Sequence, residues 1–152
     1  MLFGVGLFAG NLLGGRWADR ALTRTLVGFA LALGVVLVAF ALLTDSKVAA
    51  VALLVAMGFF GFGTVPGLQM RVLNHAAHAP TMASSANIAA FNLGNFLGVW
   101  VSGLAISAGF GWGSPLWVGA SFAFAGLAVL GLAVRAERAD RRTPAAELVT
   151  AA

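Results

Sequence analysis

The sequence predicts an all-α integral membrane protein, a helical bundle of about five transmembrane helices, and three observations lead to this prediction. Hydrophobic residues make up 61% of the 152-residue chain, and its mean hydropathy is +0.97. Charged residues make up only 9%, against about 25% in an ordinary soluble domain. The few charges form short clusters that separate long uncharged stretches. A soluble domain of this length would need far more polar surface to cover its core.

The uncharged stretches divide into segments of membrane-spanning length. A bilayer core of about 30 Å requires roughly 20 apolar residues in a helix. Residues 72–134 contain no charge and are too long for one span, so we divide them at HAAHAPT and at the Gly-rich AGFGWGSP. Helices are expected because open sheets leave backbone groups unpaired in lipid. The predicted spans are residues 1–15, 25–43, 48–69, 83–106 and 116–134.

The basic residues alternate between the two ends of this predicted bundle. Lys47 is the only basic residue in the connection after the second span, and the Gly-rich connection has none. The other connections and the tail contain Arg16, Arg20, Arg24, Arg71, Arg135, Arg138, Arg141 and Arg142. Because basic residues favour the cytoplasmic side, we expect loops 16–24 and 70–82 and the C-terminus to be cytoplasmic. The predicted location is a bacterial inner membrane, crossed several times.

The first segment is shorter than the others. Residues 1–15 would extend about 22 Å as a helix, which is less than the thickness of the bilayer core. We therefore expect an N-terminally truncated piece of a longer membrane protein. The alternative is a short, tilted or re-entrant first helix in a complete small protein. Residues 1–142 form the predicted helical part, and residues 143–152 are expected to be a disordered cytoplasmic tail.

Polar side chains distinguish interior helices from lipid-facing ones. Residues 25–43 and 116–134 are nearly free of polar side chains and are expected to face lipid. Polar groups within a membrane usually face the bundle interior or a water-filled cavity. On residues 83–106, two asparagines and a serine share one helical face at 100° per residue. This face is interpreted either as a wall of a solute pathway or as interhelical hydrogen bonding with aromatic packing. The candidate cavity-lining residues are Asn11, Asn92, Asn95, Phe96, Trp100 and Ser102.

Small residues predict where helices approach one another closely. Gly6, Gly10 and Gly14 recur every four residues, and Gly94 and Gly98 form a GxxxG pair. Such stripes let two membrane helices pack at short distance.

Several classes of function are excluded. The chain has no cysteine, and the two histidines of HAAHAPT are expected to be solvated, so no metal site is predicted. No catalytic residue is predicted, and we expect no enzyme activity. The net charge of +4 is spread along the chain rather than over one face, which argues against a nucleic-acid partner.

The stretch GGRWADR, residues 14–20, resembles the cytoplasmic signature loop of the major facilitator superfamily, G-x-x-x-D-[RK]-x-G-[RK]-[RK]. Gly15, Asp19, Arg20 and Arg24 match this pattern. Leu22 replaces its second glycine and Thr23 replaces a basic residue; such a degenerate copy is typical of the loop between helices eight and nine of twelve. The segments PGLQMRV and NIAAFNLGNFLGVWVSG resemble the drug:proton antiporter branch, close to arabinose-efflux-permease-like and chloramphenicol-resistance-like proteins.

This resemblance implies helices eight to twelve of a secondary transporter, with helices eight, ten and eleven lining its cavity. It implies proton-coupled efflux of a small hydrophobic, drug-like or sugar-like solute by alternating access. The partners would be the lipid bilayer, the missing N-terminal half of the same transporter and the small-molecule solute. The energy source would be a proton gradient, with no bound cofactor. Gly15, Asp19, Arg20 and Arg24 would have a gating role.

No acidic or basic residue lies inside a predicted span. Proton coupling requires an ionisable group within the membrane, so the coupling residue is expected outside this chain. Two other functions stay open: a complete small five-helix membrane scaffold or assembly protein without transport activity, and an uptake permease of the same fold.

Overall fold

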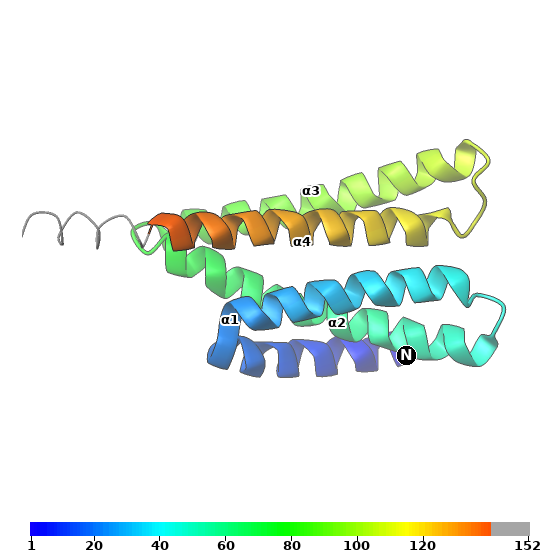
Figure 1. The fold of residues 1–152 in the computed structure, drawn as a ribbon, viewed down its shortest axis with the longest axis horizontal. Helices are drawn as coiled ribbons and strands as arrows, with labels where there is room; N and C mark the ends of the chain where they lie inside the picture. The colour runs from blue at the N-terminus through cyan, green and yellow to red at the C-terminus, as the bar shows by residue number, and fades with distance from the viewer. Residues whose placement is uncertain (141–152) are drawn as a thin grey trace, which may run out of the picture.

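The computed structural model describes residues 1–140 and contains four long helices (Figure 1). They are α1 (Leu2–Leu42), α2 (Lys47–His75), α3 (Pro80–Ser107) and α4 (Ser114–Asp140). Each is long and apolar enough to cross a membrane, and residues 1–140 contain no strand. The all-α membrane bundle is therefore confirmed. The tail predicted at residues 143–152 lies outside the described residues.

The first two predicted spans both lie in α1, which folds back on itself. The backbone of Ala21 is non-helical, with φ −154° and ψ 69°. Figure 1 shows the two parts of α1, residues 2–20 and 22–42, side by side; we call them the first arm and the second arm. The chain therefore reverses within the predicted loop over residues 16–24, but the connection is a kink at Ala21 with helix on both sides rather than an extended loop. The stretch RWADRALTR contains neither Gly nor Pro, so nothing in it breaks a helix strongly.

The other connections are short. Residues 76–79 join α2 to α3, a shorter connection than the predicted loop 70–82, because α2 continues to His75 and α3 begins at Pro80. A proline at the start of a helix has a suitable φ and loses no hydrogen bond there. Residues 108–113 join α3 to α4, and Gly109 and Gly111 adopt φ values of 88° and 82°. Residues with a Cβ atom rarely adopt this conformation, so the turn requires the Gly-rich AGFGWGSP stretch.

The first arm of α1 packs directly against the backbone of α2. Gly6, Gly10 and Gly14 are buried, and a Cβ atom at any of them would overlap a carbonyl group of α2. These carbonyl groups belong to Val55, Phe59 and Gly63, respectively. The two helices therefore approach as closely as backbone atoms allow, which glycine stripes permit.

The second arm of α1 lies between α2 and α4. The Phe29 side chain is only 4% exposed, and its ring lies 5.6 Å from that of Phe59 and 5.7 Å from that of Trp17. Towards α4, a Cβ atom at Gly34 would lie 2.9 Å from the ring of Phe124. By contrast, α3 contains no buried residue. The core of the described structure therefore lies among α1, α2 and α4, and α3 packs beside it.

The connections that contain most of the basic residues lie at one end of the bundle. Figure 1 shows the turn between the two arms of α1, the turn at 76–79 and the end of α4 at this end, which we call the basic end. The turns at 43–46 and 108–113 lie at the opposite end. The helices thus alternate in direction, as the pattern of basic residues requires.

We predict that Gly10→Leu destabilises the protein, because the new side chain would meet the backbone of α2 rather than a side chain that can move. Overpacking of this kind costs about 1–3 kcal/mol or more. The melting temperature in detergent should fall by several degrees. Gly4→Leu is the matched control, since an added Cβ at Gly4 has nothing within 4 Å. An equal loss of stability in both variants would contradict the packing.

Candidate functional site

Five of the predicted cavity-lining residues lie along α3. Asn92, Asn95, Phe96, Trp100 and Ser102 form what we call the α3 polar face. Asn92 and Asn95 are exposed and Ser102 is half-buried. Asn92 Nδ2 donates to the Ile88 carbonyl oxygen of its own helix, at 3.0 Å. Within residues 1–140, neither Asn95 nor Ser102 forms a side-chain hydrogen bond. These groups therefore do not join α3 to another described helix.

The aromatic members of the α3 polar face lie beside its amides. The rings of Phe96 and Trp100 are stacked, with centroids 6.5 Å apart and an interplanar angle of 4°. Their exposed fractions are 62% and 54%. Amide groups beside a flat aromatic surface can bind a molecule that has both polar and apolar parts.

Asn11 lies apart from α3, and the two α3 glycines are not part of a close helix contact within the described residues. Asn11 is exposed on the first arm of α1, and α1 and α3 make no contact within the described residues. A Cβ atom at Gly94 or Gly98 would have nothing within 4 Å. The structure thus places Gly6, Gly10 and Gly14 in a helix contact but leaves Gly94 and Gly98 open.

A set of hydrogen bonds between α2 and α3, the amide bridge, consists of Gln69, Ser84 and Asn87. Gln69 Nε2 donates to Ser84 Oγ at 2.7 Å, and Asn87 Nδ2 donates to Gln69 Oε1 at 2.5 Å. Beside the bridge, a cavity of about 130 Å³ is lined by Gln69 and Asn87 together with Val65, Leu68, Ile88 and Phe91. The interhelical hydrogen bonds of α3 therefore come from this bridge rather than from the α3 polar face.

A second polar cluster joins α2 to α4 at the basic end, and we call it the end network. Arg71 Nη2 forms an ion pair with Glu137 Oε1, and the two side chains are 13% and 33% exposed. His75 Nε2 lies 3.1 Å from the same carboxylate oxygen, and His75 Nδ1 lies 2.9 Å from the Arg71 carbonyl oxygen. Both ring nitrogens thus lie within hydrogen-bond distance of an acceptor oxygen. His75 is the last residue of α2 rather than a loop residue, and its side chain is 58% exposed beside the Glu137 carboxylate.

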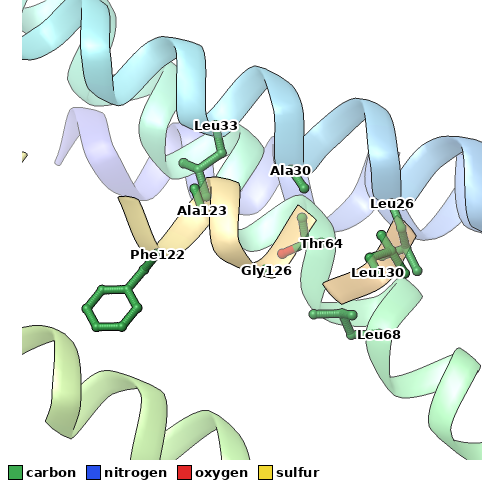
Figure 2. Close-up of a pocket in the computed structure, with 9 residues that line it drawn as sticks. All are labelled: Leu26, Ala30, Leu33, Thr64, Leu68, Phe122, Ala123, Gly126 and Leu130. Atoms are coloured by element: carbon green, nitrogen blue, oxygen red, sulfur yellow. The ribbon is translucent and has the colours of Figure 1, made fainter. Parts of the chain in front are cut away.

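An apolar cavity of about 210 Å³ lies among the second arm of α1, α2 and α4 (Figure 2). Thr64 provides the only polar side chain among its lining residues, and Thr64 Oγ1 donates to the Gly61 carbonyl oxygen at 2.7 Å. The other lining residues are Leu26, Ala30, Leu33, Leu68, Phe122, Ala123, Gly126 and Leu130. Figure 2 shows the Phe122 ring pointing away from the others. This cavity has no free polar group with which to orient a polar solute.

The residues of the signature pattern lie around Ala21. Gly15 is close to α2, since an added Cβ would lie 3.8 Å from Pro66 Cβ. Asp19, Arg20 and Arg24 are exposed, and none of them forms an ion pair within the described residues. The structure therefore brings these four residues to one turn but shows no partner for their charges.

Comparison with known proteins identifies a family and several relatives of this chain. The family model described as Major Facilitator Superfamily matches residues 1–151. The inner membrane transport protein YdhP of Escherichia coli K12 is 46% identical over 130 residues, which are 86% of this chain and 33% of that protein. The chloramphenicol resistance protein of Streptomyces lividans is 38% identical over 117 residues, 77% of this chain and 30% of that protein. No solved structure is significantly similar to the chain.

The chain belongs to the major facilitator superfamily. It spans about a third of the length of the curated relatives that it matches. The resemblance seen in the signature residues and in α3 is thereby confirmed, including the relation to a chloramphenicol resistance protein. A third relative, the uncharacterized MFS-type transporter YfhI of Bacillus subtilis, is 34% identical over 76% of this chain and 28% of that protein.

The end network and the pairing within the amide bridge were not predicted from the sequence. Arg71 and Glu137 lie 66 residues apart, and no local pattern links them. The available signal was weak: Arg71 is the only charged residue between Lys47 and Arg135. A lone charge at the end of a membrane helix requires either water or a partner, and the fold supplies the partner.

We predict that Glu137→Ala destabilises the protein, because it leaves the largely buried Arg71 without a counter-charge. In a double-mutant cycle with Arg71→Ala, the two changes should be less than additive, with a coupling of about 1–3 kcal/mol. Thermal unfolding in detergent measures both effects. Arg138→Ala is the control, since Arg138 is exposed and forms no ion pair within residues 1–140. Strict additivity would show that the ion pair contributes nothing.

Proposed function

We propose that this chain forms part of a secondary active transporter that exports a small hydrophobic, drug-like or sugar-like solute in exchange for protons. Transport would proceed by alternating access, driven by the proton gradient without a bound cofactor. The remaining part of the transporter, including its N-terminal half, would complete the cavity and supply the proton-coupling residue. Family membership supports the transport mechanism, and the similarity to a chloramphenicol resistance protein supports a drug-like solute.

The α3 polar face is the observation that carries this proposal. Its amides have no partner on another described helix, whereas the polar side chains of the amide bridge are paired. An unpaired amide in lipid is costly, by about 2–7 kcal/mol on transfer scales. A water-filled cavity is the environment that removes this cost, and the stacked Phe96 and Trp100 rings add an apolar surface to the same wall.

We further propose that the protein lies in a bacterial inner membrane with the basic end in the cytoplasm. The gathering of Arg16, Arg20, Arg24 and Arg71 at that end supports this orientation through the positive-inside rule. In this position Gly15, Asp19 and Arg20 would meet the other half of the transporter, while Arg24 would hold the turn at the cytoplasmic headgroups. The exposed charges of Asp19 and Arg20 would pair across that interface in one state of the gating cycle and separate in the other.

The orientation predicts which turns react from outside the cell. The chain contains no cysteine, so single cysteines can report accessibility within it. Thr44→Cys and Phe110→Cys should react with a membrane-impermeant maleimide in intact cells, because both lie in turns at the end opposite the basic end. Ala77→Cys should react only after the membrane is permeabilised. The reverse pattern would invert the orientation.

The solute-facing role of α3 predicts a loss of transport without a loss of folding. Asn92→Ala and Asn95→Ala should each lower efflux about fivefold, the effect of losing one hydrogen bond worth ~1 kcal/mol. Efflux of radiolabelled chloramphenicol and arabinose from cells that produce the intact transporter measures this.

Ser121→Ala is the matched control for these variants. Ser121 is an exposed serine on α4, and its Oγ donates to the Trp117 carbonyl oxygen of its own helix. The control should transport normally. If both asparagine variants are produced and transport at the unaltered rate, the α3 polar face does not contact the solute.

A further inference from the structure

A groove beside the turn at Ala21 combines a charged end with an apolar floor. It has a volume of about 380 Å³ and is lined by Trp17, Arg24, Thr25, Gly28, Phe29 and Phe60. Arg24, Thr25, Gly28 and Phe29 follow one another along the second arm of α1 over about 7.5 Å of helix. The groove thus begins at the basic end and continues towards the middle of the bundle.

The turn at the charged end of the groove has more basic than acidic side chains. Residues 16–24 contain three arginines, Arg16, Arg20 and Arg24, and a single carboxylate, that of Asp19, and all four side chains are exposed. None of them forms an ion pair within the described residues, and the Thr25 hydroxyl forms no hydrogen bond there. Arginine is well suited to bind phosphate through paired N–H donors. An anion at this end would therefore find an unpaired guanidinium and an unpaired hydroxyl side by side.

The floor of the groove is apolar and open. Phe29 is buried beneath it and Phe60 lies at its side. A Cβ atom at Gly28 would have nothing within 4 Å. Between Thr25 and Leu42 the second arm has no polar side chain, so the groove continues onto an apolar surface. An inorganic anion or a hydrophilic peptide would leave this part uncovered.

We propose that this groove binds one anionic phospholipid from the leaflet at the basic end. Its phosphate contacts the Arg24 guanidinium and the Thr25 hydroxyl, and an acyl chain lies over Gly28 and against the Phe29 and Phe60 rings, which contact each other with centroids 5.5 Å apart. Basic residues are attracted to an anionic membrane surface, and the acyl chain adds apolar contact that a free phosphate lacks. The bound lipid would connect the headgroup layer to the turn between the two arms. This proposal depends on the membrane location alone and not on transport.

The test is lipid binding by the purified, delipidated intact protein in detergent, measured by native mass spectrometry and by the thermal shift that each lipid produces. Phosphatidylglycerol should bind at least about tenfold more tightly than phosphatidylcholine with the same acyl chains. Arg24→Gln should abolish most of this preference. Arg16→Gln removes the same charge from the same turn but from outside the groove, and it should retain the preference.

The apolar half is tested separately with Gly28→Leu, which places a side chain in open space and should fold normally, as its melting temperature without lipid will show. This variant should weaken the binding of phosphatidylglycerol severalfold. Equal effects of Arg16→Gln and Arg24→Gln would mean diffuse charge attraction and would overturn the site. Unchanged binding by Gly28→Leu, or competition by inorganic phosphate at concentrations comparable to the lipid, would likewise overturn it.

Discussion

The backbone contact between the first arm of α1 and α2 is the constraint on which the rest of the described structure depends. Lipid is as apolar as a leucine side chain, so membrane helices associate mainly through close packing. Gly6, Gly10 and Gly14 make this packing as close as possible. The first arm and α2 together form a surface against which the second arm packs. Phe29 lies over Gly63 there, and Leu26 lies over Gly67. The second arm in turn supports α4, so each layer depends on the contact beneath it.

Two polar contacts add to this packed core, and residues of α2 take part in both. Gln69 connects α2 to α3 through the amide bridge, and Arg71 connects α2 to α4 through the end network. Both residues lie near the end of α2, beyond Pro66. Because α3 has no buried residue, these hydrogen bonds and its packing beside α4 hold it in place. A displacement of α3 must therefore either carry α2 with it or break the amide bridge.

Local features could be predicted from the sequence and distant pairings could not. The bilayer permits few backbone arrangements, so composition and charge spacing suffice to predict an all-helical bundle. Helical periodicity is also local, and it shows that Asn92, Asn95 and Ser102 share a face. The charge cluster predicts a connection over residues 16–24, but no local signal marks Ala21 as its position, since the neighbours of Ala21 are ordinary helix formers. The ion pair of Arg71 with Glu137 depends on how α4 packs, which only the three-dimensional structure determines.

The polar side chains of α3 differ in their hydrogen-bond partners within the described structure, and the partners change along the helix. Near the basic end, Asn87 donates to Gln69 on α2. Further along, Asn92 reaches only a carbonyl group of its own helix, and Asn95 has no side-chain hydrogen bond within residues 1–140. Lipid could satisfy none of these amides. The α3 polar face must therefore meet water, a solute or another polar protein surface, and each of these lies on the side of α3 that faces away from lipid.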